Sequence, residues 1–136
     1  MAAKRKSSFI SADAGSIILE YGMLVPILML LILGTMDIGR LIWTYTTLHR
    51  AVEASARCAA VNPAACGTPL QIAARAADEA WGLGVTPASF VALTQSCGAQ
   101  VTAVYPFPFL VPGLGGAGPD ILPNTITLTV TACYPL

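Results

Sequence analysis

The chain contains 136 residues, of which 55% are hydrophobic and only 10% are charged. This balance departs from that of typical soluble domains and indicates a protein attached to a membrane. Seven basic and seven acidic side chains give a formal net charge of zero, which counts against nucleic acid as a partner. Beyond a membrane segment, the length allows one modest domain.

The N-terminal region predicts a transmembrane helix over residues 16–36. This segment is apolar except for Glu20, and no further charge occurs before Asp37. As a helix it would extend about 31 Å, which is enough to cross the hydrocarbon core of a bilayer. The basic residues at positions 4–6 precede the span. They predict a cytoplasmic N-terminus and an exported C-terminal part.

The acidic residue inside this span has two interpretations. An acid at the bilayer centre costs about 2.5–3.5 kcal/mol on translocon-type scales, and less near an interface. Glu20 lies near the cytoplasmic end, so an ordinary signal anchor would place it among the lipid headgroups. Alternatively, it belongs to a processing and assembly signal, in which a leader of residues 1–15 is cut after Gly15 and Ser16 becomes the new N-terminus. A secretory signal peptide would instead carry its apolar stretch before the cut.

The basic leader, Gly15, Ser16 and the pair Glu20-Tyr21 resemble the class III signal of the type IV pilin superfamily, particularly its Flp pilin branch. From Gly15 to about Asn62, the chain is similar to the TadE-like minor pseudopilins (the TadE/TadF family) of tight-adherence (Tad/Flp) pilus systems. The resemblance implies a minor pseudopilin that acts in pilus assembly and is cleaved after Gly15 by prepilin peptidase.

The same resemblance implies a location and a set of partners. The protein would cross the bacterial inner membrane once, with its C-terminal domain in the periplasm, and could be incorporated in the pilus. Its partners would be the prepilin peptidase, other pilin and pseudopilin subunits, the inner-membrane assembly platform and membrane lipid. Glu20 would pair with the new amine of Ser16 on a neighbouring subunit.

Residues 37–62 predict an amphipathic continuation of the first helix. Apolar side chains recur there at helical spacing: Leu41, Tyr45, Leu48, Val52, Ala56 and Ala59. Glu53 stands four residues before Arg57, which is the favourable order for an ion pair. The helix should end at Asn62, because a residue that precedes proline is pushed out of the helical region.

Residues 63–136 predict a small exported α+β domain. Thr68, Pro69 and Gln71 form the start signal of a second helix, with a capping box. Its expected apolar stripe consists of Leu70, Ala74, Ala77 and Trp81. Gly82 is the expected stop signal of this helix, and a further helical turn is expected from Thr86 to Leu93.

The end of the chain predicts an antiparallel sheet. Residues 125–132 read TITLTVTA, in which apolar residues alternate strictly with threonines. Val101, Ala103 and Tyr105 indicate a weaker second strand. The connecting segment 106–123 is rich in proline and glycine and is long for a compact domain. Its hydrophobic residues would contact either a membrane or partner surface or the domain's own core: Phe107, Phe109, Leu110 and Val111.

Four cysteines follow the predicted span: Cys58, Cys66, Cys97 and Cys133. An even number in an exported domain indicates two disulfides, for which three connectivities exist. We favour Cys58–Cys66 and Cys97–Cys133, although Cys133 falls on the threonine side of its strand while Cys97 falls on the apolar side. Free buried thiols are an alternative, whereas a metal site is disfavoured because no CxxC motif occurs and His49 is the single histidine.

No constellation of residues indicates an enzyme or a cofactor. The segment Gly113–Gly118 matches GxGxxG, but the prolines that follow it cannot open the helix that a dinucleotide site needs. Asp78 and Glu79 are adjacent on a helix and therefore diverge, and His49 is expected on the solvent side near Glu53. Two other functions remain open: a pilus fibre subunit itself, or a single-pass membrane-anchored periplasmic binding module that keeps its leader.

Overall fold

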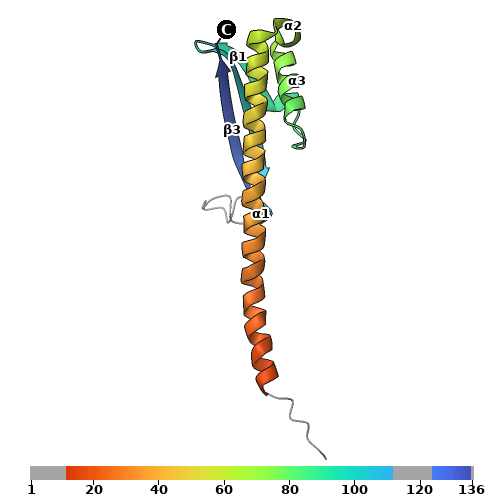
Figure 1. Cartoon of the computed structure of the whole chain (residues 1–136), viewed down its shortest axis with the longest axis vertical. Helices are drawn as coiled ribbons and strands as arrows, with labels where there is room; N and C mark the ends of the chain where they lie inside the picture. The colour runs from red at the N-terminus through yellow and green to blue at the C-terminus, as the bar shows by residue number, and fades with distance from the viewer. Residues whose placement is uncertain (1–11, 112–123, 136) are drawn as a thin grey trace, which may run out of the picture.

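The structure, a computed structural model, describes residues 12–111 and 124–135, with side chains from residue 19 onward. A long helix carries a small domain on its C-terminal half, while its N-terminal half projects alone (Figure 1). In chain order the elements are α1 (Ala12–Val61), α2 (Pro63–Cys66), α3 (Pro69–Glu79), the 3₁₀ turn η1 (Pro87–Ser89), β1 (Phe90–Gln95), β2 (Gly98–Pro108) and β3 (Thr125–Tyr134). The predicted α+β class is confirmed.

Helix α1 is a single element of 50 residues that continues through Pro26. At a rise of 1.5 Å per residue its length is about 75 Å. It ends at Val61, immediately before Asn62 and Pro63, as the restriction on residues before proline predicts. One continuous helix therefore links the apolar N-terminal segment to the domain.

The sheet has the order β1-β2-β3, and both pairs are antiparallel. The alternation predicted for the last strand is confirmed, and β3 extends two residues further, to Tyr134. The helical turn predicted from Thr86 to Leu93 is wrong beyond Ser89. From Phe90 onward the chain forms β1, because Phe90 and Ala92 alternate onto the core and pair with Ala103 and Val101 of β2.

The core lies between α1, α3 and one face of the sheet. Its most buried members are Leu48, Ala51, Val52 and Ala56 of α1, Ala73, Ala76 and Ala80 of the α3 region, and Phe90, Val101, Ala103 and Val130 of the sheet. The predicted stripe on α1 is wrong at Tyr45, which is 46% exposed, while Thr44 is buried. Thr44 rather than Tyr45 lies one turn before Leu48 on the inward face, and hydrophobicity does not reveal this because it favours the larger tyrosine over the threonine.

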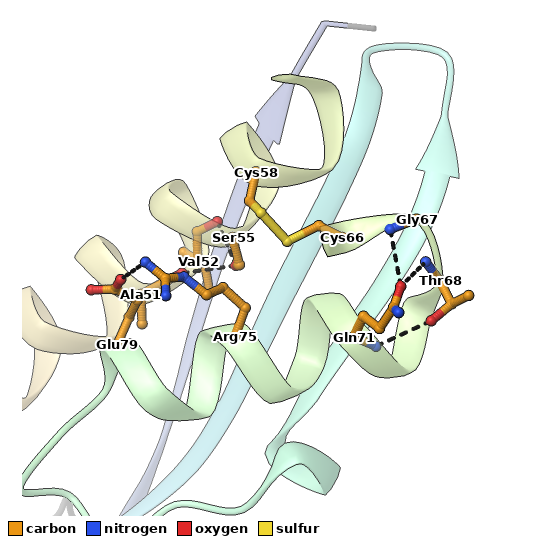
Figure 2. Close-up of a disulfide and its surroundings, with 10 residues drawn as sticks. All are labelled: Ala51, Val52, Ser55, Cys58, Cys66, Gly67, Thr68, Gln71, Arg75 and Glu79. Atoms are coloured by element: carbon orange, nitrogen blue, oxygen red, sulfur yellow. Dashed lines mark hydrogen bonds and ion pairs between the residues drawn. A yellow bond between two sulfur atoms is a disulfide. The ribbon is translucent and has the colours of Figure 1, made fainter. Parts of the chain in front are cut away.

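The predicted start of α3 is confirmed. The hydroxyl of Thr68 accepts a hydrogen bond from the backbone N–H of Gln71, whose side chain accepts one from the Thr68 N–H in return (Figure 2). The predicted apolar stripe is wrong at both ends, since Leu70 and Trp81 are 74% and 72% exposed. Instead, α3 turns its alanines inward, because small side chains allow it to approach α1 closely.

Both favoured disulfides are present. Cys58–Cys66 joins the last turn of α1 to α2, with Cα atoms 5.8 Å apart (Figure 2). Cys97–Cys133 joins the β1–β2 turn to β3, with Cα atoms 6.2 Å apart. The sequence pattern places Cys97 and Cys133 on opposite faces of their strands. Cys97 lies in a turn, where side chains do not alternate between faces, so this difference does not prevent the bond.

Candidate functional site

The N-terminal half of α1 exposes an apolar surface on all its sides. Every large hydrophobic side chain from Leu19 to Met36 is at least 40% exposed. Such a surface is far larger than the patches that soluble monomers expose. The helix is long and apolar enough to cross a membrane, which agrees with the single span predicted from the sequence. This apolar surface is therefore suited to contact lipid or other apolar helices.

Glu20 is exposed near the start of this surface, next to Tyr21, which is 65% exposed. The Glu20 carboxylate makes no ion pair with any side chain that the structure describes. Gly15 and Ser16 lie in the first turns of α1, so Ser16 and Glu20 are one turn apart on the helix. Residues 1–11 of the expected leader lie outside the described part of the chain.

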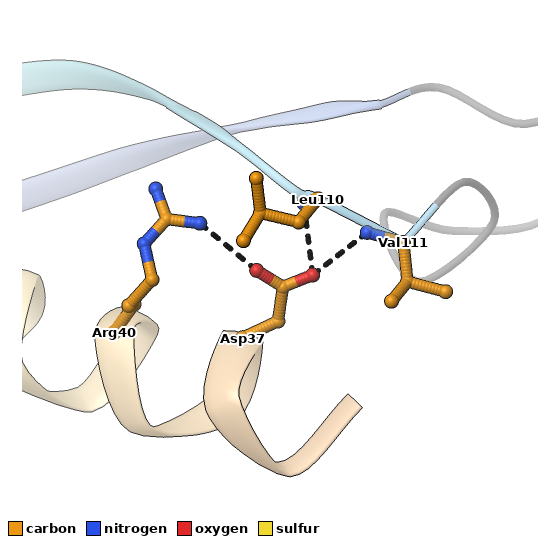
Figure 3. Close-up of polar contacts among 4 residues, drawn as sticks. All are labelled: Asp37, Arg40, Leu110 and Val111. Carbon is orange, nitrogen blue, oxygen red and sulfur yellow. Dashed lines mark hydrogen bonds and ion pairs between the residues drawn. The ribbon is translucent and has the colours of Figure 1, made fainter. Parts of the chain in front are cut away.

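Asp37 marks the point where the apolar surface ends and the domain begins, and its carboxylate is fully buried. One carboxylate oxygen accepts a hydrogen bond of 2.9 Å from Arg40 Nη1. The other accepts two bonds of 2.8 Å, from the backbone N–H groups of Leu110 and Val111 (Figure 3). Asp37 thus fixes the segment after β2 to the helix at the expected membrane boundary.

Sequence reasoning missed this role of Asp37. A local signal existed, because Arg40 follows three residues later at the spacing of a helical ion pair. The two amide donors lie 73 and 74 residues away in the sequence, and no local pattern indicates them.

The hydrophobic residues at the end of β2 and just after it divide between the two roles considered for them. Phe107 is 2% exposed and belongs to the interior. It lies beneath the guanidinium of Arg40, 5.3 Å from ring centroid to Cζ, and makes an edge-to-face contact with Phe109. Leu110 is 60% exposed and remains available to a surface outside the domain.

Two further pairs of ionisable residues lie on the surface of the domain. His49 Nδ1 lies 3.2 Å from Glu53 and both side chains are exposed, which confirms the position expected for His49. The ion pair expected between Glu53 and Arg57 is not formed. Glu79 pairs with Arg75. Within residues 19–111 and 124–135, no three potential metal ligands cluster together. The GxGxxG segment 113–118 lies outside the described residues.

Comparison with known proteins identifies the N-terminal part of the chain. Residues 15–57 match the family model described as TadE-like protein. No curated protein and no solved structure matches the chain significantly. The match begins at the expected cleavage site and covers most of α1. The resemblance to the TadE-like family is therefore confirmed over residues 15–57 of this chain.

Proposed function

We propose that the chain is a minor pseudopilin that takes part in the assembly of a Tad/Flp pilus. The observation that carries this proposal is the exposed apolar surface on the N-terminal half of α1, which lies inside the TadE-like segment and contains the carboxylate Glu20. A pilin-like subunit needs such a helix twice, first in the membrane and then in the helical bundle of the fibre. The role is structural rather than catalytic.

The proposed processing removes residues 1–15. Prepilin peptidase cuts after Gly15, and Ser16 becomes the N-terminus of the mature chain. The Glu20 carboxylate then pairs with the Ser16 amine of a neighbouring subunit and sets the register between the two helices. An unpaired carboxylate in an apolar bundle is costly, whereas a paired one is tolerated, and Glu20 has no partner among the side chains described in its own chain.

The proposed topology has residues 16–36 in the bacterial inner membrane and the domain in the periplasm. Two disulfides support it, because Cys58–Cys66 and Cys97–Cys133 both follow the span and such bonds persist in oxidising compartments. The basic residues at positions 4–6 are then cytoplasmic. Besides the peptidase and membrane lipid, the partners are other subunits and the assembly platform.

An intact mass of the protein from native membranes, without reductant, tests this proposal. Cells with and without the peptidase are compared. Loss of residues 1–15 only when the peptidase is present supports the pilin-like class, and a deficit of four hydrogens reports both disulfides. A full-length chain in the presence of active peptidase would favour a membrane-anchored binding module instead. Stoichiometric abundance in sheared pili would identify a fibre subunit rather than a minor one.

The ion pair has its own test in Glu20→Gln. This variant should be processed normally but should fail to enter the fibre. Glu53→Gln is the matched control, because Glu53 is an exposed acid of the same helix in the part that carries the domain. Normal piliation with Glu20→Gln would contradict the pairing with Ser16 without affecting the cleavage assignment.

A further inference from the structure

The two tryptophans of the chain lie against each other on the surface. Trp43 of α1 and Trp81, which follows α3, make an edge-to-face contact with ring centroids 6.4 Å apart. They are 45% and 72% exposed. Large aromatic side chains so exposed indicate a contact surface, which nothing in the proposed assembly role explains.

The tryptophan pair lies just beyond the end of the apolar surface. Trp43 is seven residues after Met36, or about 10 Å along the helix axis. A helical side chain leans toward the N-terminus, which brings the indole of Trp43 back toward Met36. Ile38 and Ile42, which lie between them, are 50% and 59% exposed. Exposed apolar side chains therefore continue along α1 beyond Met36, up to the level of Trp43.

With residues 16–36 in the hydrocarbon core, the headgroup layer begins just after Met36. It adds roughly 5–8 Å to each side of the hydrocarbon core, and tryptophan is enriched there because its ring is apolar while its N–H can remain hydrated. The turn after α3 lies beside α1 (Figure 1), and Trp81 of this turn contacts Trp43. Two separate elements thus present aromatic rings to the same layer.

A cationic group accompanies the pair. A cavity of about 190 Å³ is lined by Arg40, Trp43, Gly82 and Tyr105, among others. The Arg40 side chain is 42% exposed and gives Asp37 a hydrogen bond from Nη1. A partly exposed guanidinium is well suited to bind a phosphate.

The turn is shaped to bring the tryptophans together. Gly82 has φ of +81°, and a Cβ added there would lie 3.0 Å from Cη2 of Trp43. A side chain at this position would therefore both strain the backbone and press on the ring. Glycine allows Trp81 to lie beside Trp43 without displacing it.

We propose that Trp43, Trp81 and Arg40 form a second membrane contact, by which the exported domain rests on the phospholipid headgroups of the bilayer that α1 crosses. The inference depends on the proposed insertion of α1. With contacts on both α1 and the turn after α3, the domain is held at a fixed depth and a fixed rotation about the helix. Extraction of the subunit into a fibre must break this contact.

Tryptophan fluorescence tests the proposal directly, because no other tryptophan is present. The full chain is reconstituted in vesicles of phosphatidylcholine and phosphatidylglycerol, and Trp43→Phe leaves Trp81 as the sole reporter. Trp81 should be quenched several-fold more by a phosphatidylcholine brominated near the headgroup end of its acyl chains than by one brominated near the methyl end. It should also be poorly accessible to aqueous acrylamide.

A matched control places the reporter at the far end of the domain, as Tyr134→Trp in a chain with Trp43→Phe and Trp81→Phe. The fluorescence of that reporter should be quenched by acrylamide and should not be quenched by brominated lipid. The proposal is overturned if Trp81 behaves like the control in chains that resist alkaline extraction from the vesicles. It is also overturned if Trp81 is shielded from acrylamide without quenching by brominated lipid, since another protein chain would then cover it. Chains that fail to insert would instead refute the proposed function.

Discussion

The carboxylate of Asp37 accepts a hydrogen bond of 2.8 Å from the backbone N–H of Leu110, 73 residues later in the chain. A second bond of the same length comes from the next residue, Val111. The bonds join the end of the sheet to the helix where its exposed apolar surface stops. The position of the domain along α1 is thus fixed by one buried side chain as well as by packing.

Asp37→Ala should lower the free energy of unfolding of the domain by roughly 2–4 kcal/mol, because it leaves two backbone donors without their acceptor. Asp37→Asn should cost less, because its amide oxygen still accepts from Leu110 and Val111 while only the charge opposite Arg40 is lost. Denaturant unfolding of the full chain in detergent micelles measures both variants. Equal losses would show that the ion pair, rather than the amides, carries the stabilisation.

Local chemistry made much of the fold predictable. The break before Pro63, the capping box at Thr68 and the alternation from Thr125 each depend on neighbouring residues, and each is confirmed. The orientation of the helices was harder to predict, since α1 is apolar all round in its first half and α3 buries alanines rather than its larger Leu70. Hydrophobicity alone does not show which face a close helix–helix contact requires.

The candidate site divides in the same way. Gly15, Ser16 and Glu20 were assigned to a processing signal from a local pattern, and the family match covers these positions. Their processing role stays a prediction. The role of Asp37 was missed because its two amide partners, Leu110 and Val111, lie in the segment after β2. Likewise, Trp81 was assigned to the core from its helical spacing, whereas the chain leaves the helix after Glu79 and turns the ring outward.

The two disulfides should contribute unequally to stability. The bond Cys97–Cys133 closes a segment of 36 residues and Cys58–Cys66 one of 8 residues. The chain-entropy estimate gives a stabilisation of about 4 kcal/mol for the longer loop and about 2.5 kcal/mol for the shorter one. Replacing both cysteines of each bond by alanine and measuring unfolding in denaturant should reproduce this order. A larger loss for the shorter loop would show that contacts in the folded state, rather than loop length, dominate.

Gly82→Ala and Gly84→Ala should separate backbone strain from contact with Trp43. Both glycines have positive φ, +81° and +63°, so alanine costs about 1–2 kcal/mol at either position. Only at Gly82 would the new Cβ press on Trp43, since nothing lies within 4 Å at Gly84. Both variants should therefore lose stability, but only Gly82→Ala should change the near-UV circular dichroism of the tryptophans. The same change in Gly84→Ala would contradict the contact.

The inward face of α3 can be tested with a pair of substitutions. Ala76 is fully buried beside α1, whereas Leu70 is 74% exposed. Ala76→Leu should destabilise the domain by roughly 1–3 kcal/mol, because the larger side chain must push the two helices apart. Leu70→Ala should change the free energy of unfolding by less than about 0.5 kcal/mol, since it removes little buried surface. Denaturant midpoints of the two variants, compared with the unchanged chain, measure both effects. A larger loss for Leu70→Ala than for Ala76→Leu would indicate that Leu70 is buried and that Ala76 is exposed.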